Sequence, residues 1–527
     1  MTNMPSRRFA ALSILTMLGV SGFSSDARAQ EPVHDAEPPL AGWHEGLFYL
    51  HDRADYFRLY VQGRVHVDSL SYFGRGLGDL PADQALKSTF FLRRARLELS
   101  GEALQNTFQW ALSGEFGPTS TDNVGARNSA EDCTVDSTTG AQTCSARAGT
   151  VEAPLQKTII TDAFINYAAS RWFNVQAGQY LIPMSLENRV SDNGTPFLER
   201  STPVRLLAAP TLRDIGVMLW GEAPKTTFYY SVGIFNGDGP NRLNADSRYD
   251  AIGRVFARPL AASGDSLLRD AQIGFSARYG SRDRTYVGYD LPSLTTQGGY
   301  AFWKPTYKDA NNRFIHILPS GDQAAVAAEL FVPISKFDLT SEIVYTRSNT
   351  RETVDGYQLS GFSERLGVFK GYGYYVSGSY WIIGDRSITG FPPYSKPNHI
   401  DLEKPASAPR QGVQLLAKVE HLNLTYQSAS RSGTPDKSSP DGDITMTTLT
   451  LGATYWASKH LRLSVNYVYN YFPDSEPVSP SLTGGTQQTA DQRALAPAQN
   501  LAKGSNDGAR DGAHDLHELQ FRLGVQF

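Results

Sequence analysis

The stretch FRLYVQGRVHVD, from Phe57 to Asp68, alternates apolar and polar side chains with a period of two residues. Its odd positions are apolar or glycine, whereas its even positions are mostly charged or polar. Successive side chains of a β-strand point to opposite faces, so this stretch predicts a strand with one apolar and one polar face. A half-buried strand of a soluble sandwich would show the same pattern, so one strand leaves the fold class open.

The same alternation recurs to the end of the chain, for example from Leu519 to Phe527. Segments of roughly ten alternating residues between turn signals are typical of a transmembrane barrel, whose apolar face meets lipid and whose polar face lines the lumen. We therefore predict an all-β fold, a sixteen-stranded antiparallel transmembrane β-barrel with both ends on the periplasmic side. The predicted strands are Tyr56–Asp68, Thr89–Gly101, Thr107–Gly117, Thr158–Ala168, Arg171–Tyr180, Arg213–Glu222, Thr226–Asn236, Asp250–Pro259, Ala271–Gly280, Gln323–Val332, Lys336–Arg347, Gly371–Ile383, Gln411–Tyr426, Ile444–Trp456, His460–Phe472 and Asp515–Phe527.

The lengths of the connections predict the orientation of the barrel. Very short links, such as 169–170, alternate with long polar segments, such as Pro118–Lys157, Ser281–Asp322 and Pro473–His514. Bacterial barrels have short periplasmic turns and long external loops. Gly384–Arg410 breaks this rule, because it is long yet lies on the periplasmic side by parity. One interpretation is that it folds into the lumen as a constriction.

The N-terminus predicts export. Arg7 and Arg8 precede an apolar run from Phe9 to Val20, and a small-residue cleavage site ends at Ala29. These features predict a signal peptide over residues 1–29, because the apolar run is too short for a membrane anchor. We expect residues 30–46 to form a short N-terminal segment and residues 47–527 to form the barrel. No other long apolar run occurs, so no transmembrane helix is expected.

The composition fits one large exported β unit. Hydrophobic residues make up 40% of the chain, with 26 Tyr, 26 Phe and 47 Gly. The 49 basic and 53 acidic residues nearly cancel, which argues against nucleic acid as a partner. Cys133 and Cys144 lie in a polar segment, and in an oxidising compartment they predict a disulfide in an external loop. Free thiols are the alternative, and two thiols lack the ligands for a zinc site.

Several separated motifs, in order along the chain, resemble one known family. They are TFFLRRARLELSG from Thr89, DAFINYAASRWFNVQAGQYLIPMSLE from Asp162, TPFLERS from Thr195, LRDIGVMLWGE from Leu212 and GYGYYVSGSYWIIGDRS from Gly371. From about Tyr56 to Phe527 the chain is similar to the phosphate-selective porin O and P family. This resemblance implies a sixteen-stranded, typically trimeric outer-membrane channel in which an arginine ladder and central lysines attract phosphate or other anions.

The alternation places a set of arginines in the predicted lumen. These pore-lining and anion-binding candidates are Arg58, Arg64, Arg94, Arg96, Arg254, Arg258, Arg278 and Arg462. Arginine stays charged and can bind phosphate or carboxylate with two hydrogen bonds. The alternative is that each pairs with an inward acid such as Asp68, Glu98 or Glu342 and stiffens the wall.

Two details of the charge pattern qualify the resemblance. Arg93 shares parity with apolar residues and is expected near an interface rather than in the lumen. Lysine is sparse, and only Lys336 and Lys418 take inward strand positions. The central lysines of the family are therefore poorly represented in this chain.

The segment Leu181–Leu212 resembles the third loop that narrows many porins. Its charged residues are Glu187, Arg189, Asp192, Glu199, Arg200 and Arg205. Mixed charge of this kind would produce a transverse field across a constriction. The alternative is a solvated external loop, because irregular backbone at membrane depth occurs only inside a pore or packed on protein.

No pattern predicts catalysis. His514 and His517 would point to opposite faces of a strand, and no nucleophile motif is present, so neither a metal, a cofactor nor an enzyme is expected. The sequence predicts a porin of the bacterial outer membrane for passive diffusion of small solutes, preferring anions such as phosphate. Its expected partners are membrane lipid, the barrel-assembly machinery through the terminal Phe527, and two further copies in a homotrimer. A barrel with weak selectivity, an adhesin or a barrel hydrolase is the alternative.

Overall fold

The computed structural model describes residues 40–44, 47–54, 56–74, 77, 86, 88–117, 131–135, 142–146, 159–262, 268–283, 291–308, 314–354, 365–389, 397, 410–430, 442–473 and 514–527. The expected signal peptide, residues 1–29, lies outside this part of the chain and remains a prediction. Among the described residues, no helix has the length and apolarity needed to cross a membrane.

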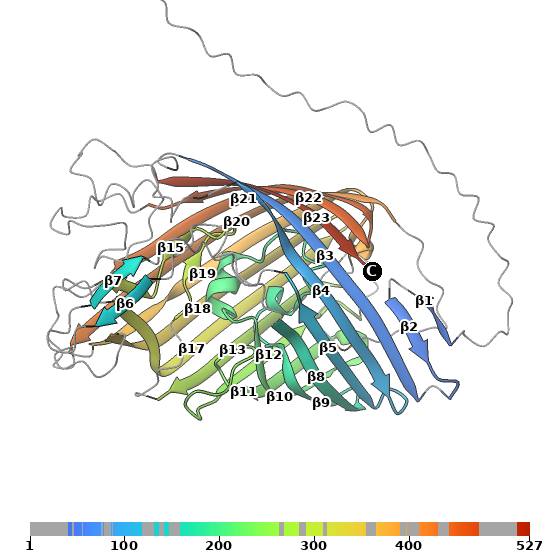
Figure 1. Cartoon of the computed structure of the whole chain (residues 1–527). Helices are drawn as coiled ribbons and strands as arrows, with labels where there is room; N and C mark the ends of the chain where they lie inside the picture. The colour runs from blue at the N-terminus through green and yellow to red at the C-terminus, as the bar shows by residue number, and fades with distance from the viewer. Residues whose placement is uncertain are drawn as a thin grey trace, which may run out of the picture. The chain divides into compact units, whose positions relative to one another are not determined.

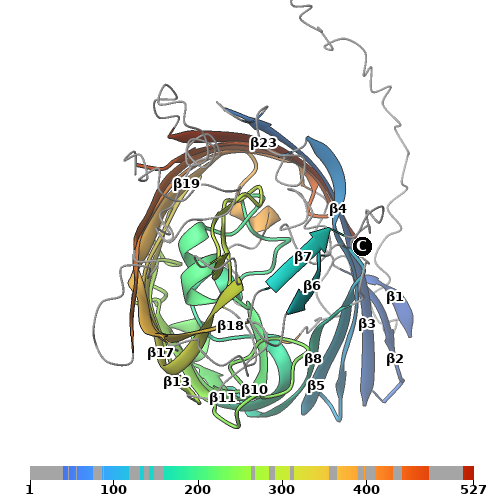
Figure 2. The same ribbon diagram turned by 60° about the vertical axis from the view of Figure 1, so that its left-hand side comes forward.

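Sixteen antiparallel strands of the described chain pair in sequence order and close into a barrel (Figures 1 and 2). The closure is made by the last strand, which pairs with the first and sets Arg522 opposite Asp68. The barrel strands are β3 (Phe57–Phe73), β4 (Thr89–Ala103), β5 (Phe108–Glu115), β8 (Ile159–Ser170), β9 (Phe173–Leu181), β10 (Arg213–Glu222), β11 (Phe228–Phe235), β12 (Asp250–Ala257), β13 (Gln272–Arg282), β17 (Phe314–Ile334), β18 (Phe337–Val354), β19 (Arg365–Ile383), β20 (Gly412–Ser430), β21 (Gly442–Ser458), β22 (Leu461–Tyr471) and β23 (Asp515–Gln526). The predicted fold class is confirmed.

Burial alternates along the strands with the period expected from the sequence. On β3, Val67 is 40% exposed whereas the next residue, Asp68, is 6% exposed. Apolar side chains such as Phe275, Ile343 and Leu451 are about half exposed on the outer face of other strands. Contiguous exposed apolar surface of this extent is costly in water and requires a lipid covering. The outer face is therefore the lipid-facing surface of an outer-membrane barrel.

Tight turns lie at one end of the barrel. The β8–β9 connection consists of Arg171 and Trp172, and the β17–β18 connection of Ser335 and Lys336. Ser335 adopts a φ of 55°, a left-handed conformation that a two-residue hairpin turn requires. Lys336 is exposed in this turn, so its predicted inward position is wrong. Strand β17 ends at Ile334, before this lysine, and the alternation of inward and outward side chains does not continue through a turn.

The long connection from Gly384 to Arg410 leaves the barrel at the same end as these turns. It begins with a 3-10 turn, η6 (Arg386–Ile388), in which Arg386 Nη1 lies 3.0 Å from Asp338 Oδ1. Ile388 packs against Trp381 and Trp456. Residues 390–396 and 398–409 lie outside the described chain. The interpretation that this segment constricts the lumen therefore remains a prediction.

A hairpin that the sequence did not predict precedes the barrel. Strands β1 (Ala41–His44) and β2 (Leu47–His51) pair with each other, and β2 pairs with the first residues of β3. The terminal strand β23 pairs with the remainder of β3 as far as Arg64. Phe527 then exchanges two main-chain hydrogen bonds with Gly63, of 2.6 and 2.9 Å. The hairpin thus occupies the edge of β3 that β23 leaves unpaired.

The two cysteines lie on a separate two-stranded sheet. Strands β6 (Glu131–Val135) and β7 (Gln142–Ala146) are antiparallel, and Cys133 lies directly opposite Cys144. Directly opposed residues have Cβ atoms close enough for a disulfide. The side chains of both residues lie outside the described part of the structure, so the bridge itself remains a prediction.

We expect Cys133 and Cys144 to be bridged in the exported protein. Mass spectrometry after alkylation in unreduced denaturant should find neither thiol modified, and both modified after reduction. The bridge should contribute little to barrel stability, because it closes only a short loop between neighbouring strands. Alkylation of both cysteines without reduction would show that the register does not lead to a disulfide.

Candidate functional site

The connection between β9 and β10 lies inside the barrel (Figure 2). This lumenal loop, residues 182–212, contains the short helical turns η3 (Glu187–Arg189) and η4 (Val204–Ala208). Its side chains are largely buried, with Met184, Val204 and Ala208 each 0% exposed. The structure therefore places the predicted segment in the lumen rather than in an external solvated loop. Its function as a constriction remains a prediction.

Acidic side chains of the wall hold one side of the lumenal loop. Glu342 on β18 accepts hydrogen bonds from the backbone amides of Leu186 and Glu187, both of 2.9 Å. Glu420 on β20 accepts one of 2.5 Å from the amide of Thr202. Hydrogen bonds to a charged acceptor are roughly twice as strong as neutral ones. These carboxylates therefore fix the loop against β18 and β20, near its start and again after its midpoint.

Arginines of β22 and β23 hold the middle of the loop. Arg462 on β22 donates to the carbonyl oxygens of Asp192 and Thr195, at 3.0 and 3.1 Å. Arg522 on β23 donates to the carbonyl oxygen of Leu198 at 2.6 Å. Both arginines are buried. They satisfy carbonyl groups that the irregular backbone would otherwise leave without partners, which is costly in a water-poor site.

The same arginines form ion pairs at the loop. Arg522 binds both carboxylate oxygens of Asp68, at 2.8 and 2.7 Å, and its Nη2 also lies 3.0 Å from Glu199 Oε1. Arg94 Nε lies 2.9 Å from Asp192 Oδ2. Arg522 thus connects the barrel closure between β3 and β23 to the lumenal loop.

A β-bulge in β4 brings a further arginine to the loop. His66 of β3 lies opposite Arg94 and Val67 lies opposite Leu92, so Arg93 has no opposed residue. Arg93 Nη2 lies 2.8 Å from Glu199 Oε2. The expected position of Arg93 at an outer interface is therefore wrong. A bulge inserts one extra residue and breaks the alternation on which that expectation rested.

The other predicted pore arginines occupy varied surroundings. Arg64 pairs with Glu98 at 3.8 Å, Arg96 with Glu115 at 3.2 Å and Arg254 with Glu329 at 2.7 Å. Arg258 donates to Gln272 at 3.3 Å, and Arg58 is half-buried on β3. Among the described residues, no hydrogen bond or ion pair engages Arg278. For Arg64, Arg94, Arg96 and Arg254, the structure shows the acid pairing that formed the alternative prediction.

The predicted charged residues of the lumenal loop lie close together. Arg200 Nη1 lies 2.5 Å from Asp192 Oδ1, and Glu187 accepts a hydrogen bond of 2.8 Å from the amide of Ser201. Arg189 donates to the carbonyl oxygen of Leu181. Arg205 points away from the others and donates to Thr295 Oγ1 at 2.7 Å.

The arginines keep two loop carboxylates ionised. Burial opposes the charged form of Asp192, but Arg200 and Arg94 hold the pKa of its carboxyl well below the usual range. Burial also opposes ionisation of Glu199, yet Arg93 and Arg522 lower its pKa to about 2. Glu187 differs, because burial raises the pKa of its carboxyl despite Lys418 nearby. The carboxylates of Asp192 and Glu199, which lie beside the arginines, therefore remain charged.

We call this set of contacts the arginine cluster. Its cations are Arg64, Arg93, Arg94, Arg96, Arg200, Arg462 and Arg522. Its anions are Asp68, Glu98, Glu115, Asp192 and Glu199. Within these described contacts the guanidinium groups outnumber the carboxylates. The cluster thus has a net positive charge beside the lumenal loop.

Comparison with known families shows to which family this barrel belongs. Residues 62–479 match the family model described as phosphate-selective porin O and P. The chain belongs to this family. The protein is therefore an outer-membrane porin, a channel rather than an enzyme.

Solved structures of similar fold are distant in sequence from this porin. They include OmpT of Vibrio cholerae in its trimer form, at 10% identity and a TM-score of 0.44 over 90% of this chain and 100% of that one. The anion-selective porin of Comamonas acidovorans has 11% identity and a TM-score of 0.40 over 89% and 100% of the two chains. The channel DcaP of Acinetobacter baumannii has 12% identity and a TM-score of 0.43 over 91% and 99%. No curated protein matches the chain.

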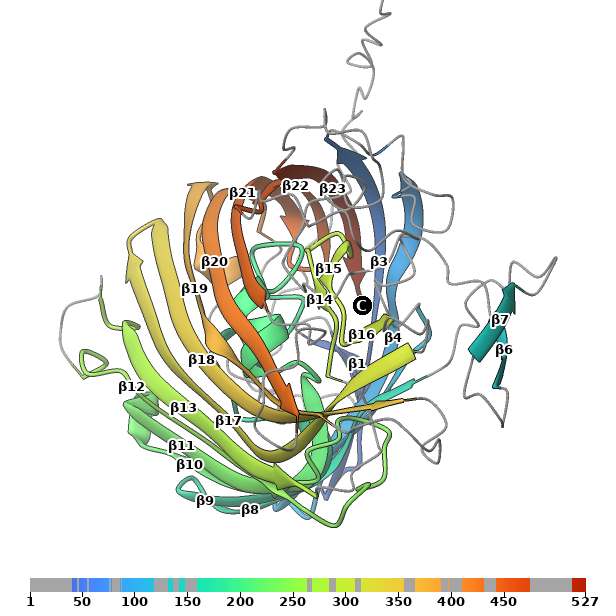
Figure 3. The ribbon, with the colours of Figure 1, turned by 90° about the vertical axis from the view of Figure 1, so that its left-hand side faces the viewer.

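A second segment of the porin folds into the lumen (Figure 3). Residues 291–305 contain the short strands β14 (Leu294–Thr295) and β15 (Ala301–Trp303). Gln297 donates to Glu420 at 2.6 Å and to Thr450 at 3.1 Å. This segment belongs to the connection Ser281–Asp322, which was predicted to be a long external loop. We call it the second lumenal segment.

Sequence reasoning did not include Arg522 among the candidate pore residues, and it did not predict the contacts of Lys418. Arg522 stood on the polar face of the predicted last strand, but its role as the link between wall and loop depends on the position of Glu199. Lys418 was correctly predicted to face inward. It is fully buried, 3.5 Å from Glu420 and 4.7 Å from the ring centre of Phe197. It is thus engaged by the wall and the lumenal loop.

Proposed function

We propose that this porin allows passive diffusion of small anions, including phosphate, and that it assembles as a homotrimer. The arginine cluster is the observation that carries the anion preference. A net positive charge beside a narrow water-filled passage attracts anions and repels cations, and low-dielectric walls focus the field.

The distribution of charge around the lumenal loop supports this proposal. The arginine cluster lies along β3, β4, β22 and β23, whereas Glu329, Glu342 and Glu420 lie on β17, β18 and β20. Glu329 and Glu420 are paired with Arg254 and Lys418, so the positive charge of the arginine cluster has no equal negative counterpart on these strands. An anion would follow the arginine side of the passage.

Phosphate recognition would fall mainly to arginine in this chain. Lys418 is engaged by Glu420 and Phe197, and Lys336 lies in a turn outside the lumen. Guanidinium groups bind phosphate oxygens in pairs, which a lysine cannot do. We propose that phosphate binds at the arginine cluster more weakly than at a dedicated lysine site and so passes without being trapped.

The proposed trimer and assembly signal follow from the family resemblance and from the C-terminus. The family is typically trimeric, and Phe527 ends the chain with its ring 47% exposed on the outer side of Gly63. We propose that the barrel-assembly machinery reads this terminal residue. Light scattering of the detergent-solubilised porin would determine its oligomeric state.

Phosphate should reduce the chloride conductance of the porin. In planar bilayers with KCl, increasing potassium phosphate at neutral pH is expected to decrease the single-channel current, because phosphate occupies the arginine cluster longer than chloride does. Potassium acetate at the same concentration is the control for a monovalent anion. If phosphate and acetate have equal effects, the porin is a general diffusion channel without phosphate preference.

A further inference from the structure

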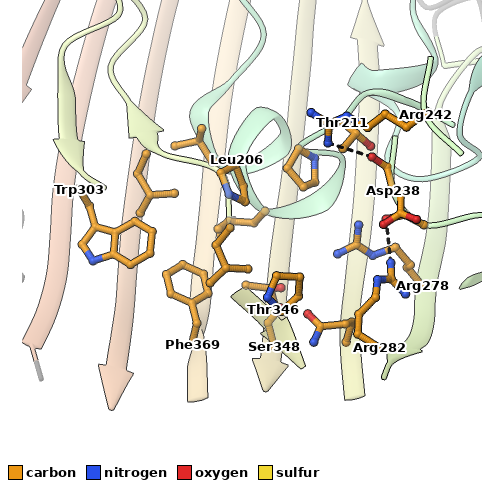
Figure 4. A pocket seen from close by; sticks show the side chains of 18 residues that line it. Leu206, Thr211, Asp238, Arg242, Arg278, Arg282, Trp303, Thr346, Ser348 and Phe369 are labelled. Carbon is orange, nitrogen blue, oxygen red and sulfur yellow. Dashed lines mark hydrogen bonds between the residues drawn. The ribbon is translucent and has the colours of Figure 1, made fainter. Parts of the chain in front are cut away.

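A cleft lies between the two lumenal segments and the barrel wall (Figure 4). It has a volume of about 110 Å³ and opens to solvent. The lumenal loop contributes Leu206, the second lumenal segment contributes Trp303, and the wall contributes Arg278, Arg282, Thr346 and Phe369. The arginine cluster described above does not line it. We call it the vestibule cleft.

One end of the vestibule cleft is basic. Arg282 is engaged there, because its Nη1 lies 2.8 Å from Asp250 Oδ1 and its Nη2 donates to the carbonyl oxygen of Gly237 at 2.7 Å. Arg278 lines the same end (Figure 4). Within the described chain it has no hydrogen bond or ion pair, and its Nε is buried without a partner.

An unpaired buried guanidinium group is costly, and an anionic ligand would relieve that cost. Buried charges are normally paired with an opposite charge or fully hydrogen-bonded. Asp250 is already engaged by Arg282 and therefore does not neutralise both arginines. Asp238 and Arg242, of opposite charge, also line this end, and Asp250 and Asp214 lie near enough to Arg278 to act on it electrostatically. Within the described chain, Arg278 nevertheless has no carboxylate bound to it and borders a space that a ligand can enter.

The other end of the cleft is apolar and aromatic. The rings of Trp303 and Phe369 lie 5.3 Å apart between centroids, at an angle of 41°. Leu206 lines the cleft beside them, and Thr346 lies between the two ends (Figure 4). Trp303 is fully buried behind Phe369, so Phe369 and Leu206 supply the apolar surface that a ligand ring could contact.

We propose that the vestibule cleft binds an aromatic carboxylate, with the carboxylate at Arg278 and the ring toward Phe369 and Leu206. The cleft is far larger than the space that one water molecule needs, and it is open, so a ligand bound there can extend into the lumen. A carboxylate matches the geometry of a guanidinium group. The inference extends the proposed anion passage, because it names a class of organic anion that the porin captures before it reaches the arginine cluster.

The test uses the full mature porin in planar bilayers, with 2-naphthoate as the probe. Naphthoate is expected to interrupt the KCl current at concentrations at which acetate, which lacks the ring, has no effect. Neutral 2-naphthalenemethanol should also have no effect. We expect Arg278→Gln to increase the half-blocking concentration of naphthoate by about tenfold, as for the loss of one hydrogen bond to a charged group.

Two further variants locate the site. Phe369→Ala should weaken block by naphthoate, because the apolar end loses one ring. Arg347→Gln is the matched control, because Arg347 is exposed on the other face of β18, next to Thr346. It should leave the half-blocking concentration unchanged. Heat-modifiable migration on gels shows that each variant forms a barrel.

Distinct results overturn the inference and the proposed function. Equal block by naphthoate in wild type and in folded Arg278→Gln, or equal block by acetate and naphthoate, would contradict the cleft site. If the channel prefers anions but does not respond to naphthoate, the proposed function stands and the cleft site is wrong. If naphthoate blocks through Arg278 in a channel without anion preference, the cleft site stands and the proposed function is wrong.

Discussion

Replacing both Arg94 and Arg462 by glutamine is expected to lower the anion-to-cation permeability ratio by roughly three- to tenfold. The two substitutions remove the excess of guanidinium groups over carboxylates in the arginine cluster. A change of about 0.7–1.4 kcal/mol in the free energy of an ion at the constriction has an effect of this size. The measurement is the reversal potential in a KCl gradient across a planar bilayer.

The barrel should tolerate this double change. Asp192 keeps Arg200 at 2.5 Å, and a glutamine at position 462 keeps an amide donor for the loop carbonyls. The matched control replaces Arg94 and Arg462 by lysine, which retains charge but loses the guanidinium geometry. The lysine variant should keep the wild-type reversal potential. A wild-type reversal potential in the folded glutamine variant would exclude these two arginines from ion selection.

Arg522→Ala is expected to destabilise the barrel by about 3–5 kcal/mol. The substitution leaves Asp68 without its bidentate partner and removes one of the two arginines that contact Glu199. Removing one member of a buried ion pair has a cost of about this size, because the remaining charge is uncompensated. The measurement is urea unfolding of the porin in lipid vesicles, followed by tryptophan fluorescence.

A double-mutant cycle separates this cost from a simple loss of packing. Asp68→Ala in the Arg522→Ala background should restore part of the stability, because the uncompensated carboxylate is removed. The same variants should allow more proteolysis of the lumenal loop, since Arg522 also holds the carbonyl group of Leu198. Strictly additive effects of the two substitutions would contradict the proposed ion pair.

Alternation predicted the barrel because a transmembrane strand has two different environments along its whole length. Arg213–Glu222 was predicted with the bounds that β10 has in the structure, and each predicted strand corresponds to one strand of the barrel. Boundaries were less accurate for β17 and β18, which extend beyond the predicted segments at their external ends. Above the lipid the two faces have similar surroundings, so the periodic signal weakens.

The site was less predictable, because it depends on contacts between distant segments. Arg93 faces Glu199 only because of the bulge in β4, which shifts the alternation by one residue at a position that the sequence pattern did not identify. The pairing of Arg522 with Glu199 joins residues more than three hundred positions apart. The motif around Glu199 indicated a constriction loop, but its partners on the wall required the three-dimensional arrangement.

The second lumenal segment shows a different limit of prediction from sequence. Residues 291–305 are apolar enough to be buried, with Phe302 and Trp303 fully buried. Their length and position fitted an external loop, and a loop that folds inward has the same connection length as one that folds outward. Contacts with distant segments distinguish the two arrangements, such as the hydrogen bonds of Gln297 to Glu420 and Thr450 and that of Arg205 to Thr295.

The central claim is that the arginine cluster makes this porin select anions, and the reversal potential of the unmodified protein tests it most directly. The purified porin is inserted into a planar bilayer between concentrated and dilute KCl at neutral pH. We expect a reversal potential with the sign of the chloride equilibrium potential, which should approach zero in the Arg94→Gln, Arg462→Gln variant. A wild-type reversal potential at zero, or with the sign of the potassium equilibrium potential, would contradict the account.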